Sequence, residues 1–169
     1  MMASGDPLIP LDAWSGVPAS IAGATFGTIT GATEVYQCAN FDDTTIQYLD
    51  FMCEMPSAYG GGGITVKIRW AAASATNAVV WQAALRRIED DVDDIETSHT
   101  YDYNAAAAAT APTVIGELSF DTITFTNGAD MDSVAAGDLF VLRIRRKADD
   151  AGDTMSGDAR LISVNVTET

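Results

Sequence analysis

The chain has 169 residues, of which 47% are apolar, which is enough for one hydrophobic core and gives no reason to expect two domains. With 24 acidic and 9 basic residues it carries a net charge of −15, so we expect no direct binding to nucleic acid or to acidic membranes. It has no long apolar run, and residues 1–20 lack the basic start and apolar centre of a signal peptide, so we expect neither a transmembrane helix nor an export signal.

Residues 1–20 contain three prolines among isolated apolar side chains, a pattern typical of an extended arm rather than a helix. Prolines keep such a segment extended and lower the entropy lost when it docks. The arm packs either on its own domain or on a neighbouring subunit, and its apolar anchors would be Leu8, Ile9, Leu11 and Trp14. We therefore expect an arm over residues 1–20 and one β-sandwich domain over residues 21–169.

Residues 21–40 combine small and β-forming side chains and predict one or two short strands. Residues 48–70 hold two runs in which apolar and polar residues alternate, the pattern of half-buried strands. The apolar faces are Leu49, Phe51, Cys53 and Met55 in the first run and Ile64, Val66, Ile68 and Trp70 in the second. Because Pro56 and four consecutive glycines interrupt the pattern, we expect the two runs to pair as a hairpin across a loop.

Alternation resumes at residues 79–86, which predict a further strand, and the acidic run 89–94 that follows predicts a loop because it cannot lie inside a sheet. In residues 117–126 the apolar positions change parity, with Leu118 and Phe120 on one and Ile123 and Phe125 on the other. A β-bulge near Asp121 would keep both pairs inward.

Residues 131–136 predict a short helical turn, and residues 140–145 and 162–166 predict two closing strands. About eight strands, polar loops and no substantial amphipathic helix indicate an all-β protein, an antiparallel sandwich of the jelly-roll or immunoglobulin-like kind. The residues expected to be buried between its two sheets are Leu49, Phe51, Ile64, Val66, Ile68, Trp70, Val79, Trp81, Phe140, Leu142, Ile144 and Val164.

A resemblance extends over about residues 41–166. The segments that carry it are FDDTTIQYLDFMCEMPSAYGGGGITVKIRWAAAS, VVWQAALRRI and TITFTNGADMDSVAAGDLFVLRIRRKADDAGDTMSGDARLISVNVT. Together they resemble small jelly-roll structural proteins of tailed bacteriophages and prophages, which include head decoration (cement) proteins, head fibres and tail-tip modules. The resemblance implies a virion protein assembled in the host cytoplasm, with the major capsid protein or another virion protein as partner. It also implies a homo-oligomer, for which a trimer would suit a decoration role.

No catalytic motif is present, and we expect neither an enzyme nor a cofactor. His99 is the only histidine, and no GxSxG nucleophile pattern accompanies it, so a surface or half-buried strand histidine is expected. Glycines 60–63 lack the lysine and hydroxyl residue of a phosphate loop and indicate a flexible turn. Cys38 and Cys53 have no metal-binding spacing and are expected to be small core residues.

Two acidic groups are weak candidates for Ca²⁺, since carboxylate oxygens are its preferred ligands. The first group is Asp90, Asp91, Asp93 and Asp94, which lack the spacing and the glycine of an EF-hand and are expected to form a solvated loop. The second is Asp149, Asp150, Asp153 and Asp158, for which pairing with the neighbouring arginines and Lys147 is expected.

Two classes of function remain open. A decoration protein that clamps capsid subunits would explain the arm and the absence of catalytic motifs. A carbohydrate-binding or host-adhesion module would use aromatic side chains in or near loops to stack on sugar rings, and the candidates are Tyr59, Tyr101 and Tyr103. A hydrolase built on paired carboxylates is a third, more remote alternative.

Overall fold

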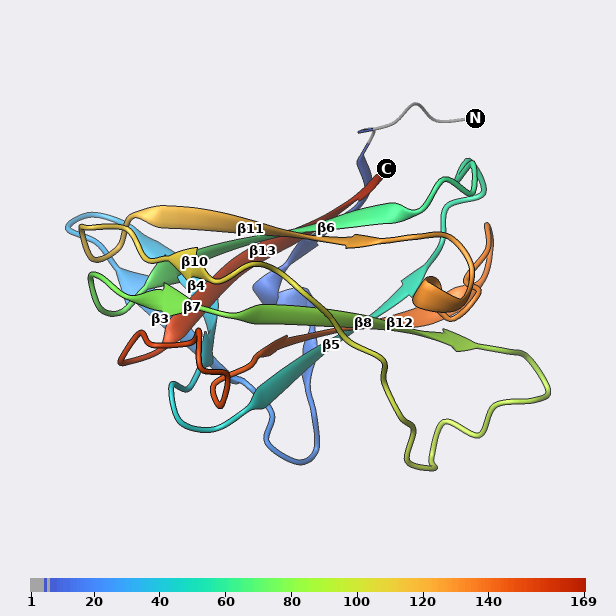
Figure 1. The fold of residues 1–169 in the computed structure, drawn as a ribbon, viewed down its shortest axis with the longest axis horizontal. Helices are drawn as coiled ribbons and strands as arrows, with labels where there is room; N and C mark the ends of the chain where they lie inside the picture. The colour runs from blue at the N-terminus through green and yellow to red at the C-terminus, as the bar shows by residue number, and fades with distance from the viewer. Residues whose placement is uncertain (1–4, 6) are drawn as a thin grey trace.

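Two antiparallel β-sheets pack face to face in the computed structural model, which describes residue 5 and residues 7–169 (Figure 1). The elements are β1 (Pro7–Asp12), η1 (Ala13–Ser15), β2 (Val17–Pro18), β3 (Thr25–Thr30), β4 (Val35–Phe41), β5 (Gln47–Glu54), β6 (Ile64–Ala72), β7 (Ala78–Val79), β8 (Trp81–Ile88), β9 (Asn104–Ala105), β10 (Ala109–Thr110), β11 (Leu118–Phe125), η2 (Ala129–Met131), β12 (Leu139–Arg146) and β13 (Ala159–Glu168). No helix in the described part of the chain is long and apolar enough to cross a membrane.

The larger sheet has the strand order β11-β6-β13-β4-β3, and β1 pairs with the C-terminal half of β13. The smaller sheet has the order β2-β5-β12-β8-β9, and β7 and β10 form a separate two-stranded ribbon. From β4 onward the long strands β4, β5, β6, β8, β11, β12 and β13 alternate between the two sheets, which is how a jelly roll closes an antiparallel sandwich. The predicted fold class is confirmed.

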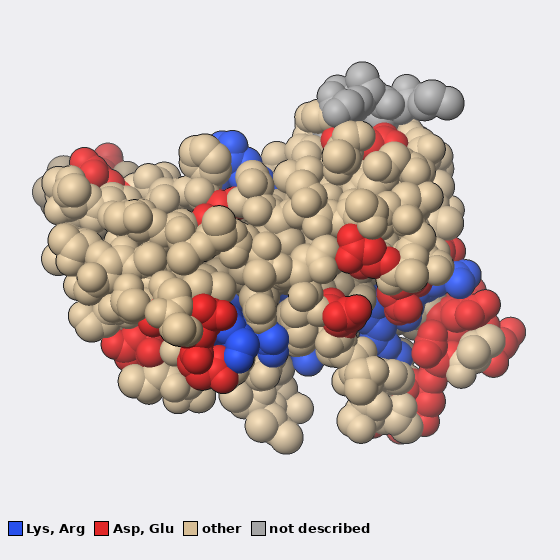
Figure 2. Space-filling model, viewed as in Figure 1, with Lys and Arg blue, Asp and Glu red and all other residues tan. Residues whose placement is uncertain are grey.

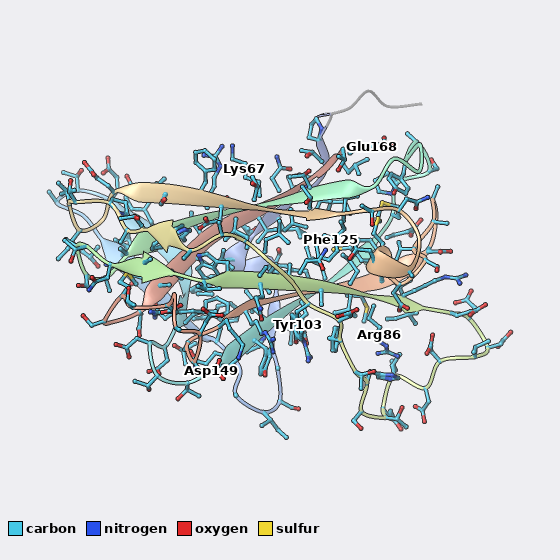
Figure 3. The ribbon with its side chains drawn as sticks, in the orientation of Figure 1. Lys67, Arg86, Tyr103, Phe125, Asp149 and Glu168 are labelled. Atoms are coloured by element: carbon cyan, nitrogen blue, oxygen red, sulfur yellow. The ribbon has the colours of Figure 1, made fainter. Side chains whose placement is uncertain are left out.

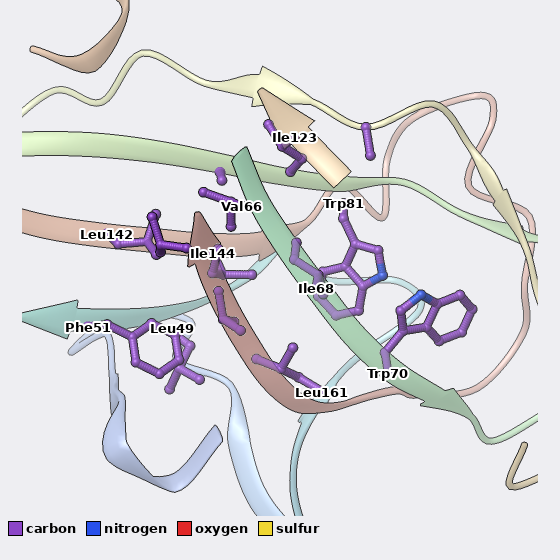
Figure 4. Close-up of a cluster of buried hydrophobic side chains, with 14 of the residues drawn as sticks. Leu49, Phe51, Val66, Ile68, Trp70, Trp81, Ile123, Leu142, Ile144 and Leu161 are labelled. Atoms are coloured by element: carbon purple, nitrogen blue, oxygen red, sulfur yellow. The ribbon is translucent and has the colours of Figure 1, made fainter. Parts of the chain in front are cut away.

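The core lies between the two sheets and consists of the apolar side chains that point inward from alternate positions of the long strands (Figure 4). All twelve predicted core residues are buried, none more than 1% exposed. At one end the Trp70 and Trp81 rings lie 6.2 Å apart, and Phe41 meets Trp81 edge to face at 5.1 Å. Aromatic side chains of this size bury the largest areas per residue, so this cluster anchors the two sheets to each other.

The predicted hairpin of residues 48–70 is wrong in its pairing. β5 pairs with β12 and β2, whereas β6 pairs with β11 and β13 in the other sheet. The intervening loop crosses from one sheet to the other, and its Tyr59 is 7% exposed, with the Oη atom accepting a hydrogen bond from the Gly63 amide at 3.0 Å. Because this ring fills the edge of the core, the loop is a structured crossover and not a flexible turn.

The predicted bulge in β11 is absent, because β11 pairs with β6 in unbroken register over its whole length. Asp121 takes the inward position between the two apolar pairs, and its Oδ2 atom accepts a hydrogen bond from Trp70 Nε1 at 2.8 Å. Leu118 and Phe120 therefore lie on the outer face, 59% and 57% exposed, with the Lys67 ammonium 4.1 Å from the Phe120 ring. A buried indole N–H needs a hydrogen-bond acceptor. Giving Trp70 that acceptor therefore stabilises the fold more than burying Leu118 and Phe120 would.

The irregularity lies instead in β13, where the register against β6 shifts between Leu161 and Ser163. Leu161 is fully buried and Ile162 is only half-buried. The prediction that Ile162 faces inward together with Val164 and Val166 is therefore wrong for Ile162. Val164 and Val166 face inward as predicted.

Part of the predicted arm is a strand of the sandwich, so the boundary at residue 20 is not a structural one. Residues 1–4 and 6 lie outside the described residues, and β1 pairs with β13 from Pro7 to Asp12. The Asp12 side chain then caps η1 by accepting a hydrogen bond from the Ser15 amide at 2.9 Å. Pro7 and Pro10 lack backbone N–H donors, and the sheet tolerates this because both lie in the edge strand β1.

Arg146, at the end of β12, is fully buried and organises the loop between the last two strands. Its guanidinium pairs with Asp153 at 2.7 Å and donates to the carbonyl oxygens of Phe41, Met155 and Gly157. A buried charge is tolerated only when it is paired and its donors are satisfied, and this arrangement meets both conditions. The predicted use of the second acidic group in local ion pairs is confirmed for Asp153.

Candidate functional site

On the outer face of the smaller sheet lie the alternate, mostly polar residues of β5, β12 and β8, with β12 in the middle. Their registers place side chains in rows across the strands. One row is Asp50, Arg143 and Ala84, and the next is Tyr48, Arg145 and Gln82. These rows bring together residues that are far apart in the sequence.

Arg143 and Asp50 form a bidentate ion pair at the centre of this face. Arg143 Nε and Nη2 donate to the two carboxylate oxygens of Asp50, both at 2.6 Å, and only 20% and 23% of the two side chains is exposed. Burial alone would lower the pKa of Arg143, but the hydrogen bonds and charge of Asp50 outweigh it and raise the pKa above its usual range. The bidentate geometry fixes the direction of both side chains, and their opposite charges offset each other.

Two tyrosines from the segment after the acidic loop stack over the arginines of β12. The Tyr101 ring lies 4.0 Å from the Arg143 guanidinium, and the Tyr103 ring lies 3.5 Å from that of Arg145. Ala84, on β8 between them, has only a methyl group, which leaves room for the rings to reach β12. Burial raises the pKa of both tyrosines, so both hydroxyls stay protonated at neutral pH. Figure 3 shows Tyr103 on the side of this sheet that faces away from the larger one.

A groove with a volume of about 880 Å³ runs across this face. Two loops that project from the smaller sheet form its walls, one around residues 17–21 and the other around residues 95–99, and Figure 2 shows the hollow between the two projections. Its floor contains Tyr48, Asp50 and Arg143. Four exposed apolar side chains stand along its rim: Val17, Ile21, Met52 and Ile95. The site thus combines aromatic and aliphatic surface with a fixed set of hydrogen-bonding groups, which is typical of small-ligand sites.

A second hollow of about 440 Å³ adjoins the groove, because Arg86 and His99 line both. Arg86 is 8% exposed, and its Nη2 atom lies 3.5 Å from Asp93 Oδ1 in an ion pair without a hydrogen bond. His99 is half-buried as predicted but lies in a loop rather than in a strand, and its Nε2 atom lies 2.9 Å from the Asp94 carbonyl oxygen. Figure 3 shows Arg86 at the base of the acidic loop, so this loop both encloses the groove and neutralises its guanidinium.

Most predicted arm anchors contact their own domain. Leu8 is 9% exposed and belongs to the core, while Ile9 and Leu11 are half-buried against it. Trp14 is 43% exposed, its Nε1 atom donates to the Cys38 carbonyl oxygen at 3.0 Å, and its ring lies 5.5 Å from that of Phe26. Docking of the arm on another subunit stays a prediction, with Trp14 as its most accessible residue.

The acidic residues are distributed rather than gathered. Within the described residues, no group of three or more histidine, cysteine, aspartate or glutamate side chains has the arrangement of a metal site. Asp93 accepts from the Glu89 amide at 2.7 Å, and Asp94 accepts from the Glu96 amide at 2.9 Å. Asp90 and Asp91 are exposed. These carboxylates thus shape the loop that walls the groove.

The three tyrosines proposed for sugar stacking have different fates. Tyr59 is buried in the crossover loop, and Tyr101 and Tyr103 lie half-buried against arginines with only part of each ring accessible. The sequence pattern does not single out Tyr48, Asp50 and Arg143 as site residues, because periodicity marks the apolar face of a strand and does not distinguish among the residues of its polar face. An aromatic residue on that face, such as Tyr48, was the available signal.

No protein-family model matches the sequence, and a search of curated proteins gives no match either. Solved structures do match. The CBM22-1 xylan-binding domain of Paenibacillus barcinonensis Xyn10C aligns over 99% of this chain and 97% of its own, with a TM-score of 0.54 at 7% identity. The CBM22-2 xylan-binding domain of the same protein aligns over 95% of this chain and 99% of its own, with a TM-score of 0.54 at 12% identity.

The chain is a jelly-roll β-sandwich. Its structural neighbours are carbohydrate-binding module domains, and identities this low establish the fold alone. The likeness extends over nearly the whole of the neighbouring domains. Nothing in these comparisons supports the phage origin implied by the sequence resemblance.

Proposed function

We propose that the protein binds a glycan in the groove on the outer face of the smaller sheet. The observation that carries the proposal is the groove floor, where the Tyr48 ring lies beside the bidentate pair of Arg143 and Asp50. A sugar ring has an apolar C–H face and a rim of hydroxyl groups. An aromatic ring can stack on the former, and a guanidinium and a carboxylate supply donors and acceptors for the latter.

Two further observations support the proposal. The volume of about 880 Å³ lies in the range of ligand sites, and the open ends of a groove suit a chain of sugars better than a closed pocket would. The structural neighbours are named as xylan-binding domains, which makes xylan the first ligand to test. The Asp50 carboxylate on the groove floor is held by Arg143, and we infer binding without catalysis.

Affinity electrophoresis and calorimetry with soluble xylan, and then with a panel of neutral and acidic polysaccharides, test this proposal. We expect Tyr48→Ala to weaken binding by about tenfold, because one aromatic stacking contact contributes roughly 1 kcal/mol beyond its buried area. Tyr36→Ala is the matched control, since Tyr36 is 53% exposed on β4 in the other sheet. Equal effects of the two substitutions, or binding to no member of the panel, would contradict the proposal.

A structural role in a phage virion is the second candidate. It rests on the sequence resemblance and on the exposed apolar side chains around the groove, Val17, Ile21, Met52 and Ile95, which are 63–83% exposed. Exposed apolar patches of this kind mark protein interfaces as well as ligand grooves. Cosedimentation of the protein with assembled capsids tests it, and Met52→Asp should abolish binding if this rim meets the major capsid protein.

A further inference from the structure

β3 forms the free edge of the larger sheet. It pairs with β4 along its whole length on one side and ends the strand order on the other. No other backbone hydrogen bond in the described part of the chain reaches residues 25–30. An edge of this kind presents unpaired amide and carbonyl groups to any strand that can lie beside it.

This edge lacks the features that usually prevent strand addition. Natural edge strands carry lysine, proline or a bulge, or are very short. β3 has the sequence TFGTIT, with no charged residue and no proline, and its register against β4 is unbroken over six residues. The edge is therefore regular and open to pairing.

The hairpin of β3 and β4 also extends beyond the part of the larger sheet that the smaller sheet covers. Phe26 lies opposite the fully buried Ala39, yet Phe26 is 42% exposed, and Thr28 and Thr30 on the same face are exposed as well. Figure 1 shows β3 and β4 at one end of the molecule. Although Phe26 packs against Trp14, the far end of the ribbon is exposed on both faces, at Val35 on one and at Tyr36 on the other. A two-stranded ribbon is only marginally stable by itself, so a further strand would stabilise it.

Charge identifies the partner. The chain has a net charge of −15, so two copies repel each other over most of their surfaces. Residues 13–41 contain a single charged residue, Glu34, and include η1, β3 and β4. The β3 edge is thus the place where a second copy can approach closely at little electrostatic cost.

We propose that β3 pairs antiparallel with β3 of a second copy around a two-fold axis through Thr28. A two-fold axis perpendicular to the sheet keeps each face on its own side, so a symmetric register must be centred on one residue. Centring on Thr28 places Thr28 opposite its own copy and Phe26 opposite Thr30, which are favourable cross-strand pairs. The larger sheets of the two copies then become one continuous sheet, and the groove on the smaller sheet is left free in both.

Sedimentation velocity of the full chain over a wide concentration range tests the dimer. We expect a reversible monomer–dimer equilibrium, strengthened by salt because salt screens the net charge. Thr28→Lys places two like charges opposite each other at the axis and should raise the dimer dissociation constant by about tenfold or more. Thr124→Lys is the matched control, since Thr124 is an exposed threonine on β11, the opposite edge of the same sheet.

A charge-swapped pair tests the register. We expect Thr28→Lys and Thr28→Glu each to be monomeric, and an equimolar mixture of the two to form a heterodimer, because opposite charges then meet at the axis. Melting curves verify that both variants fold, which is expected for an exposed position. A wild type that stays monomeric at all concentrations, or dimers that persist in both single variants, would overturn the proposal.

Discussion

At the scale of single residues, the most informative feature is a carboxyl group that occupies a core position. Asp121 is 8% exposed and faces inward from β11, where burial raises its pKa to about 6, although the hydrogen bond from Trp70 partly opposes the shift. The folded protein therefore binds this proton more tightly than the unfolded chain does. Stability from this group is gained as the pH falls from about 6 to about 4 and is lost as the pH rises through that window.

Asp121→Asn should remove this pH dependence, because an amide oxygen can still accept from Trp70 but carries no charge. The shift from 3.8 to about 6 corresponds to about 3 kcal/mol. We expect the variant to be more stable than the wild type at pH 7 and close to it at pH 4, as measured by urea unfolding followed by tryptophan fluorescence.

Two comparisons make this experiment decisive. Hydrogen bonds that outweigh burial lower the pKa values of Asp42 and Asp130, so these two groups change the stability with pH in the direction opposite to Asp121. They do so in both wild type and variant, and their contributions cancel in the difference in stability between the two. Asp121→Ala leaves the buried Trp70 N–H without an acceptor and should be destabilising at every pH. A constant difference between wild type and Asp121→Asn across the pH range would show that the buried carboxyl is not the titrating group.

At the scale of elements, β1 shows how a segment with an arm-like sequence becomes part of a sheet. Its prolines and its separation from the other strands predict an extended arm, and the backbone is indeed extended. What the sequence does not reveal is the partner, since β13 lies at the other end of the chain. β4 pairs only with residues 159–161 of β13, and β1 pairs with residues 163–167 along the same edge.

Leu8→Ala should therefore lower the free energy of unfolding by about 2–3 kcal/mol, because it removes a buried leucine from the core. Ile21→Ala is the control, since Ile21 is 83% exposed and its truncation should change stability by no more than about 0.5 kcal/mol. Guanidinium unfolding of both variants provides the measurement. Equal stabilities would mean that β1 docks too weakly to belong to the domain and would restore the arm as a separate segment.

The same comparison shows what periodicity can and cannot predict. Alternation identified the buried faces of β5, β6, β8 and β12, because side-chain direction in a strand depends on local geometry. It failed in part of β11 and β13, where a buried carboxyl and a register shift change which residues face inward. It could not identify which strands pair, since β5 and β6 are adjacent in sequence and lie in different sheets. The groove depends on that pairing: Asp50, Ala84 and Arg143 meet only through the registers of β5, β12 and β8. Loops such as residues 95–99 had no period from which to predict their position.

At the scale of the whole molecule, charge is distributed unevenly between the sheets. Six of the nine basic residues lie on β8, on β12 or directly after β12: Arg86, Arg87, Arg143, Arg145, Arg146 and Lys147. Most have a carboxylate partner, as with Arg143 and Asp50 or Arg146 and Asp153. Of the other acidic residues that the structure describes, Asp121 and Glu168 are buried on strands and many of the rest lie in surface loops. Figure 2 shows clusters of acidic residues around the lower edge. The excess negative charge is therefore a surface property, which salt screens.

We expect monovalent salt to raise Tm modestly and Ca²⁺ and Mg²⁺ to have equal effects at equal ionic strength, because Asp93, Asp94 and Asp153 are already engaged within the protein. A specific ion present at 100 times its dissociation constant would instead add about 2.7 kcal/mol, which corresponds to a rise of roughly 5–10 °C in Tm for a chain of this size. Differential scanning fluorimetry with Ca²⁺, Mg²⁺ and chelator distinguishes the two. A rise specific to Ca²⁺ that disappears in Asp94→Asn would assign a metal site to the loop that walls the groove, and the glycan experiments would then have to be repeated with Ca²⁺ present.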